Sequence, residues 1–107
     1  MLRIVKPYKP LTESELPEET VEICEKFERQ YKEVCAKSIE KNQRFHYTFY
    51  VNVFSGSDLI DWMISKKLVK NRLHGEFLGR KLLEGHLIHH VSFKRDFYDG
   101  FHLYKFF

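Results

Sequence analysis

The stretch Asn52-Val-Phe-Ser-Gly-Ser-Asp-Leu-Ile-Asp-Trp-Met63 decides the fold, because the chain changes there from one kind of secondary structure to another. Residues 44–54 are dense in aromatic and β-branched side chains, which favours an extended hairpin arm. Ser55-Gly-Ser-Asp58 is a strong helix start, since its side-chain oxygens can accept the free backbone N–H groups of a first turn. The helix that follows is apolar on nearly every face, so we expect it to be buried and Asp61 to need a polar partner.

Upstream of the arm, the sequence predicts one long helix that starts near residue 17. Pro17 tolerates a first helical turn, and the two glutamates after it favour the positive end of a helix dipole. Apolar residues then recur at spacings of three and four and form one stripe. This stripe consists of Val21, Cys24, Phe27, Tyr31, Val34, Cys35 and Ile39. Residues 1–16 contain two of the three prolines and little periodicity, so we expect an extended leader before a domain over 17–107.

Downstream, a basic connection over 66–73 leads to a third predicted helix over 73–84. Gly85 is expected to end this helix in the left-handed conformation. Residues 87–91 and 101–106 then predict a C-terminal β-hairpin. The inward-facing residues expected on the third helix are Phe77, Leu78, Leu82 and Leu83.

The predicted fold is therefore α+β: a three-helix bundle with a β-hairpin arm between its first two helices and a C-terminal β-hairpin as a wing. Large apolar residues from all of these elements are expected to build one core. The candidate core residues are Phe27, Tyr31, Phe54, Leu59, Trp62, Met63, Leu82, Leu83 and Ile88.

Length and composition support one domain without a membrane span. The chain has 107 residues, 43% of them hydrophobic, which is enough apolar surface for a core. Its longest uncharged apolar run is far below the ~18 residues of a membrane span, and its start lacks the apolar segment of a secretion signal. Cys24 and Cys35 are separated by about 16 Å of rise on the predicted helix, too far to bond to each other. We therefore expect a reducing, intracellular setting.

No constellation of side chains indicates an enzyme, a metal site or a cofactor site. His89 and His90 are adjacent on a predicted strand, so their side chains leave opposite faces and do not converge on one ion. Cys24 and Cys35 belong to an apolar stripe, as ordinary core cysteines do. Asp58 already has a role at a helix start, and no phosphate-binding loop accompanies it. We therefore expect a non-catalytic binding module that uses neither metal nor cofactor.

Charge is divided unequally along the chain. Residues 1–40 hold seven Lys or Arg and nine Glu, whereas residues 41–107 hold eleven Lys or Arg and six Asp or Glu. Within the second part, bases gather in short groups that favour an acidic partner such as a lipid headgroup. The alternative is that these side chains are simply solvated. The candidate basic patch consists of Lys66, Lys67, Lys70, Arg72, Lys94 and Arg95.

The stretch 52–63, followed by Leu78-Gly-Arg-Lys-Leu-Leu-Glu-Gly-His-Leu-Ile-His-His-Val91 and Phe97-Tyr-Asp-Gly-Phe-His-Leu-Tyr-Lys-Phe106, resembles the DEP domain family of signalling proteins. The three blocks occur in the family's order and cover about residues 24–107. The resemblance implies a winged-helix-like bundle with a protruding hairpin "finger". It also implies a non-catalytic, cytoplasmic module that brings its host protein to the inner face of a membrane, through anionic phospholipid or through the cytoplasmic region of a receptor or other membrane protein.

Carried onto this chain, the finger corresponds to residues 44–53, with His46, Tyr47, Phe49 and Tyr50 as candidate partner-binding residues. Aromatic side chains on a projecting element are typical of contacts with protein hot spots or with a bilayer interface. About half of them should nevertheless be core, because a strand buries every second residue. A projecting arm joined by short hinges also makes domain exchange between two copies feasible.

Two other functions remain open from the residues alone. One is protein scaffolding without a lipid step, in which the finger docks a partner and the bases are solvated. The other is nucleic-acid binding by Arg72, Arg80 and Lys81 on a recognition helix, with Lys94 and Arg95 on the wing. The net charge of +3 is low for a DNA reader, so no nucleic-acid partner is expected.

Overall fold

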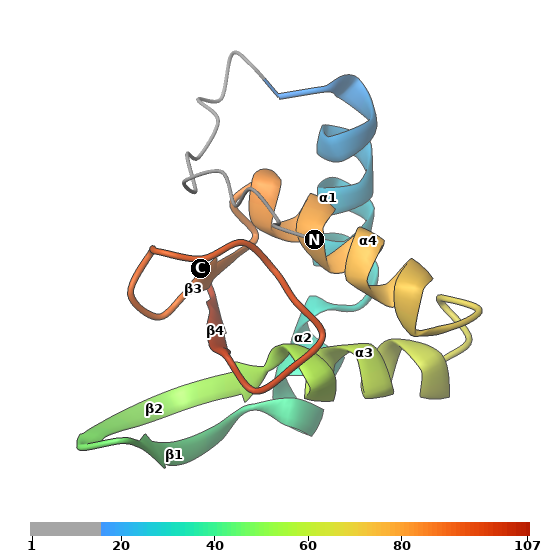
Figure 1. The fold of residues 1–107 in the computed structure, drawn as a ribbon. Helices are drawn as coiled ribbons and strands as arrows, with labels where there is room; N and C mark the ends of the chain where they lie inside the picture. The colour runs from blue at the N-terminus through green and yellow to red at the C-terminus, as the bar shows by residue number, and fades with distance from the viewer. Residues whose placement is uncertain (1–15) are drawn as a thin grey trace, which may run out of the picture.

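The computed structural model describes residues 16–107, so the predicted leader over 1–16 lies, apart from Leu16, outside the described residues. Within that range the elements are α1 (Glu18–Gln30), α2 (Lys32–Ile39), β1 (Lys41–Phe45), β2 (Thr48–Ser55), α3 (Gly56–Ser65), α4 (Arg72–Glu84), β3 (Ile88–His90) and β4 (Leu103–Phe106). The α+β fold class is confirmed, with an arm between helices and a C-terminal hairpin (Figure 1). No helix in the described part of the chain is both long and apolar enough for a membrane span.

A break at Tyr31 divides the predicted long helix into α1 and α2. The backbone of Tyr31 has φ −129° and ψ −25°, outside the helical region, although no Gly or Pro marks the position. A straight helix would place Val34 on the same face as Phe27, about two turns away. After the break, Cys35 is fully buried instead and Val34 is 55% exposed. The prediction of one continuous helix with Val34 on its apolar stripe is therefore wrong.

The arm and the C-terminal hairpin belong to one antiparallel sheet with the strand order β1-β2-β4-β3. β2 joins β4 through two residue pairs, Phe54 with Tyr104 and Ser55 with Leu103. The rest of β2 pairs with β1, and this two-stranded arm extends away from the helices (Figure 1). The chain reverses at His46 and the residue after it, and His46 takes a left-handed φ of 57°.

The core lies between the helices and the base of this sheet. Trp62 of α3 packs against Phe27 of α1, with ring centroids 6.2 Å apart, and Phe54 packs against Tyr104. Tyr31 is partly buried and adds its ring to Trp62 at 6.3 Å. The other candidate core residues are all buried: Phe27, Phe54, Leu59, Trp62, Met63, Leu82, Leu83 and Ile88.

Two glycines set which face of α4 turns inward. Gly75 and Gly79 are buried, and a Cβ at these positions would meet the side chains of Ile60 and Phe97. Because residues four apart share a helix face, this close approach directs Phe77 outward, where it is 48% exposed. The prediction that Phe77 faces inward is therefore wrong.

The end of α4 also differs from the prediction. Gly85 has φ −84°, and the left-handed residue is His86, with φ 63°. Gly85 instead packs closely against α1, since a Cβ there would meet the Cys24 side chain. The glycine is therefore needed for packing between α4 and α1 and not for a left-handed turn.

The β3–β4 connection is held over the start of α3. The Gly56 N–H donates to the His102 carbonyl at 3.2 Å, and the Ser57 N–H donates to the Gly100 carbonyl at 3.0 Å. The Tyr104 hydroxyl donates to the Asp96 carbonyl at 2.8 Å. The first two bonds fix the long connection between β3 and β4 against the helix start, and the third ties the connection to β4.

We expect Gly56→Ala to destabilise the domain by about 1–3 kcal/mol, the usual cost of overpacking, because the added Cβ would overlap the Tyr98 carbonyl. Gly100→Ala is the matched control, since nothing lies within 4 Å of a Cβ at Gly100. Urea denaturation of the two variants gives the difference in free energy of unfolding. Equal stability of both variants would contradict the close packing of the β3–β4 connection on α3.

Candidate functional site

The end of the arm carries the most exposed aromatic residue among the candidate site residues. Tyr47 is 99% exposed, and Phe49 behind it is 59% exposed. The His46 ring packs edge-on against Phe45, with centroids 4.4 Å apart, and is exposed. Tyr50 is partly buried. The structure thus places all four candidate finger residues on the arm, with Tyr47 and Phe49 presented most fully.

Strand pairing separates the two faces of the arm. Arg44 is paired with Phe49, and Gln43 with Tyr50. Because directly opposed residues share a face and neighbours alternate, Phe49 and Arg44 lie on one face and Tyr50 on the other. One face therefore combines an exposed ring with a guanidinium, a pairing suited to an apolar partner that carries negative charge.

A bulge at the base of the arm sets its bend. The register shifts between Lys41 and Gln43, and Asn52 adopts a left-handed φ of 54°. The Asn42 carboxamide oxygen accepts the Asn52 N–H at 3.1 Å. Asn tolerates the left-handed conformation better than most residues, so Asn52 is well suited to the bend at this position.

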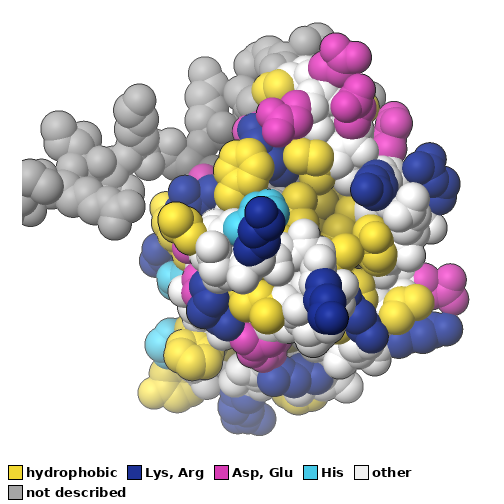
Figure 2. Space-filling view, turned by 90° about the vertical axis from the view of Figure 1, so that its right-hand side faces the viewer, with side chains coloured by type: hydrophobic (Ala, Val, Ile, Leu, Met, Phe, Trp, Pro, Cys, Tyr) yellow, Lys and Arg dark blue, Asp and Glu magenta, His cyan; other side chains and the backbone are white. Residues whose placement is uncertain are grey.

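Lys66, Lys67 and Lys70 lie in the α3–α4 connection and are exposed. None of the three forms an ion pair with any residue of the range 16–107. We call these three residues the lysine loop. Figure 2 views the molecule from this end, where Lys and Arg side chains are spread among hydrophobic ones and acidic side chains gather toward the top, over α1. The arm leaves from the opposite end of α3 (Figure 1).

The remaining members of the candidate basic patch are not all grouped with the lysine loop. Lys94 and Arg95 are exposed in the β3–β4 connection, just after β3, whereas the lysine loop precedes α4. Figure 1 shows β3 near the far end of α4 from that loop. The six basic residues therefore lie in two separate groups. The lysine loop and Arg72 form one group, and Lys94 and Arg95 form the other.

Arg72 is engaged with carboxylates of the domain. Its guanidinium donates to Asp61 at 2.6 Å and, through two nitrogens, to both oxygens of Asp99 at 2.8 Å. It also donates to the Ser57 hydroxyl at 3.1 Å. Hydrogen bonds from Arg72 lower the pKa of Asp99. Arg72 thus supplies the partner expected for Asp61 and ties α4 to α3 and to the β3–β4 connection.

The other bases of α4 also have acidic neighbours. Arg80 lies 3.4 Å from Glu76 and donates to the Phe97 carbonyl at 3.0 Å. Lys81 lies 3.7 Å from Glu84. The three bases that a recognition helix would direct at phosphates are thus each paired within the domain.

The cysteines have the chemistry of core residues. Burial raises the pKa of Cys24 to about 11 and that of Cys35 to about 12. Because the thiolate is the nucleophile, such thiols are poorly reactive at neutral pH. Among the described residues, no group of three or more His, Cys, Asp or Glu side chains is arranged to hold a metal ion.

Two apolar residues on α4 are exposed, although Phe77 was predicted to face inward and Leu73 was not singled out from the sequence. Leu73 is 78% exposed and Phe77 is 48% exposed, next to the lysine loop in the chain. The Lys81 ammonium lies 5.5 Å from the centre of the Phe77 ring. The signal that could have found them is the spacing of Gly75 and Gly79, which marks the opposite, closely packed face.

The Arg72–Asp99 pair should couple by about 0.5–1 kcal/mol at neutral pH, because it is bidentate but partly exposed. Since the pKa of Asp99 is lower in the folded state, this contribution is present above the unfolded value near 3.8 and is lost as pH falls through the folded pKa. Urea denaturation of wild type, Arg72→Met, Asp99→Asn and the double variant from pH 7 to pH 2.5 measures it. A coupling that stays constant over this range would contradict the assignment.

Comparison with known families agrees with this architecture. The sequence profile of the domain found in Dishevelled, Egl-10 and Pleckstrin (DEP) matches residues 39–106. The match includes the arm, α3, α4 and the C-terminal hairpin.

Curated relatives share this segment within much longer proteins. The chain is 28% identical over 94 residues to the mouse lysosomal cholesterol signaling protein, covering 88% of this chain and 11% of that protein. It is 32% identical over 87 residues to the human phosphatidylinositol 3,4,5-trisphosphate-dependent Rac exchanger 2 protein, and 31% identical over 88 residues to the mouse Rac exchanger 1 protein. Each of these two matches covers 80% of this chain and 5% of the relative. Because the profile match covers more than half of the chain, the chain belongs to the DEP domain family.

Proposed function

We propose that this domain is a non-catalytic signalling module that recruits its host protein to the cytoplasmic face of a membrane. The observation that carries the proposal is the 99% exposure of Tyr47 at the end of the projecting arm, with Phe49 behind it. A membrane protein or receptor tail would bind these rings. Anionic phospholipid headgroups would attract the lysine loop, with Lys94 and Arg95 as a second basic group.

The lysine loop can supply a weak, salt-sensitive attraction. Each Lys near an anionic leaflet contributes roughly 1 kcal/mol, so three give about 3 kcal/mol, which corresponds to a factor of about a hundred in partitioning. Arg72 adds little to this, because two carboxylates already compensate its charge. A lipid interaction of this strength gives transient membrane binding and does not by itself anchor the protein there.

The two surfaces are separate, so a partner at one does not cover the other. The arm and the lysine loop extend from opposite ends of α3 (Figure 1). A receptor bound at the arm would therefore leave the lysine loop free for the leaflet. The names of two relatives record dependence on phosphatidylinositol 3,4,5-trisphosphate, an anionic lipid, which supports testing such lipids here.

The alternative from a different class is scaffolding without lipid. It is favoured by the separation of the arm from the lysine loop, which allows the arm to dock a protein alone. Exchange of the arm between two copies also stays a prediction. It would break few strand contacts, because only two residue pairs join β2 to β4. Nucleic-acid binding is disfavoured because Arg72, Arg80 and Lys81 already have acidic partners. A gel shift with random duplex at low salt tests that last function.

We expect Lys66→Ala/Lys67→Ala/Lys70→Ala to reduce binding to vesicles containing phosphatidylserine or phosphatidic acid by up to about a hundredfold, because ~1 kcal/mol is lost per lysine. Cosedimentation at low salt measures the partition coefficient. The matched control is Lys26→Ala/Arg29→Ala/Lys37→Ala, which removes three positive charges from α1 and α2, away from the lysine loop. Equal loss in both variants, or equal binding of wild type to neutral vesicles, would reject the lysine loop as the lipid contact.

We expect Tyr47→Ala/Phe49→Ala to abolish recruitment to a membrane protein while leaving the fold intact, because both rings are exposed and make no core contact. The measurement is localisation of the full-length host protein in cells, with circular dichroism of the domain as a check on folding. Val34→Ala, another exposed apolar residue, is the control. Unchanged localisation of the arm variant would remove the arm from the mechanism.

A further inference from the structure

Two exposed apolar residues on α4 are used by neither of the surfaces proposed above. Leu73 is 78% exposed, Phe77 is 48% exposed, and neither belongs to the core cluster. They are four residues apart on one helix, so their side chains lie one turn apart on the same face. Gly75 and Gly79 form the packed face of α4 and leave this pair on the outer one. We call Leu73 and Phe77 the apolar pair.

The lysine loop is held in place beside the apolar pair. The Lys70 N–H donates to the His74 ring at 3.3 Å, and the Asn71 carboxamide oxygen accepts the His74 N–H at 2.8 Å. These bonds fix the end of the loop on the first turn of α4, which contains Leu73. Val69, which lies between the lysines in the chain, is buried in the core. Cations and apolar side chains are therefore presented together on a preformed surface.

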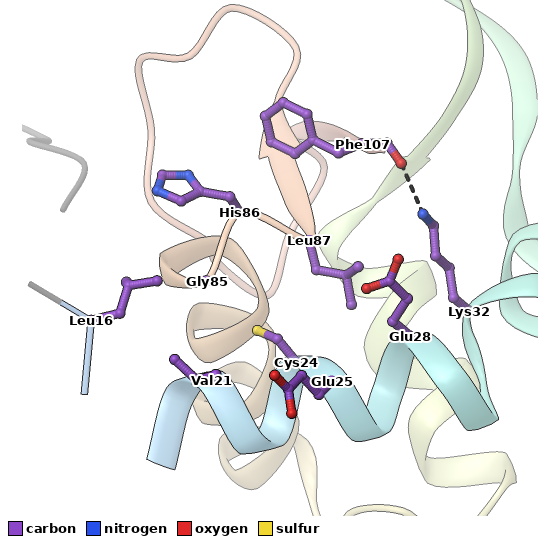
Figure 3. A pocket seen from close by; sticks show the side chains of 10 residues that line it. All are labelled: Leu16, Val21, Cys24, Glu25, Glu28, Lys32, Gly85, His86, Leu87 and Phe107. Atoms are coloured by element: carbon purple, nitrogen blue, oxygen red, sulfur yellow. Dashed lines mark hydrogen bonds between the residues drawn. The ribbon is translucent and has the colours of Figure 1, made fainter. Parts of the chain in front are cut away.

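The opposite end of α4 is acidic. A pocket of about 490 Å³ lies there, between α1 and Gly85, and Glu25 and Glu28 line it (Figure 3). Neither glutamate forms an ion pair with any residue of the described range. Leu73 lies in the first turn of α4 and Gly85 follows its last turn, so about 18 Å of helix separates the two ends. An anionic surface is therefore attracted at the end with the apolar pair and repelled at the other.

The residue types beside the lysine loop favour a bilayer over a protein as the partner. Lysine is depleted in protein interfaces, and leucine is under-represented among the residues that dominate their binding energy. Beside a membrane, lysines instead keep their charged ends at the headgroups while their carbon chains and neighbouring apolar residues contact the acyl region. Figure 2 shows this combination, with hydrophobic side chains among Lys and Arg. Arg72, whose planar fork could bind a partner's carboxylate, is already bound to Asp61 and Asp99.

We propose that the apolar pair inserts into the boundary between the headgroups and acyl chains of an anionic bilayer. This inference rests on the lipid contact proposed for the lysine loop, and it adds a hydrophobic contribution to that electrostatic one. The lysines act over a Debye length of about 8 Å at physiological salt and turn this end of the domain toward the leaflet. Burial of the apolar pair then requires direct contact and is not screened by salt. The two contributions can therefore be separated by their salt dependence.

The first test measures cosedimentation of the whole chain with vesicles of phosphatidylcholine and phosphatidylserine. Leu73→Ser/Phe77→Ser should lower the partition coefficient at least about tenfold, because the burial of two apolar side chains is lost. This ratio should hold as salt is raised, whereas the ratio of wild type to the triple-alanine variant of the lysine loop should shrink. The matched control is Val34→Ser/Phe101→Ser, which changes two exposed apolar residues outside α4 and should bind as wild type does. Circular dichroism checks the folding of both variants.

A fluorophore that senses apolar surroundings gives a second readout when it is attached at Leu73→Cys. On the same vesicles its emission should shift to shorter wavelength, and lipids that carry a spin label on the acyl chain should quench it. The same label at Phe101→Cys, which is 81% exposed as Phe101 in wild type, should do neither. Cys24 and Cys35 are both buried, so a brief reaction modifies the introduced thiol.

The outcomes separate this inference from the proposed function. Salt-sensitive binding of wild type, with equal partitioning of the Leu73→Ser/Phe77→Ser variant or no quenching at position 73, would overturn the insertion and leave the lysine loop as the lipid contact. Unchanged vesicle binding of that variant with lost localisation of the host protein would indicate an acidic protein partner and would also overturn it. Failure of wild type to bind anionic vesicles would overturn both the insertion and the proposed lipid contact.

Discussion

The two residue pairs between β2 and β4 fix how the whole domain presents its surfaces. Phe54 and Ser55 pair with Tyr104 and Leu103, so the last residues of the arm become the first residues of the core sheet. Ser55 then also caps α3, because its hydroxyl accepts the Asp58 N–H at 3.0 Å. β2 pairs with β4 at its inner end and continues directly into the buried helix α3. These two connections fix the direction in which the outer part of β2 projects. The arm therefore projects from a rigid base even though its outer part is a two-stranded ribbon.

Charge pairing within the domain decides which bases are available to a partner. Arg72 and Arg80 hold the β3–β4 connection against α3 and α4 through carboxylates, a backbone carbonyl and an aromatic ring. Their guanidinium groups suit this role, since a planar fork can bind several acceptors at once. The lysine loop has no such partner among the described residues. A residue count would treat all of these bases alike, whereas the ion pairs separate those that stabilise the fold from those that face solvent.

Several features could be predicted because they depend on neighbours in the chain. Aromatic and β-branched residues before Ser55 predicted the arm, and the Ser55 cap predicted the start of α3. The break at Tyr31 could not be predicted in this way, since it carries no Gly or Pro and follows from which side chains the core accepts. The inward face of α4 was misjudged for the same reason, because Phe77 is apolar but the helix approaches its neighbours through glycine.

The sequence by itself determined the element types, their order and the candidate aromatic and basic residues, because local propensity, capping and periodicity act over a few residues. Tertiary structure alone decided which of those candidates are presented. It gave the pairing of Arg72 with Asp61 and Asp99 and the separation of the lysine loop from Lys94. Each of these depends on the relative positions of residues far apart in the chain. Those positions are set by how the helices and the sheet pack around the core.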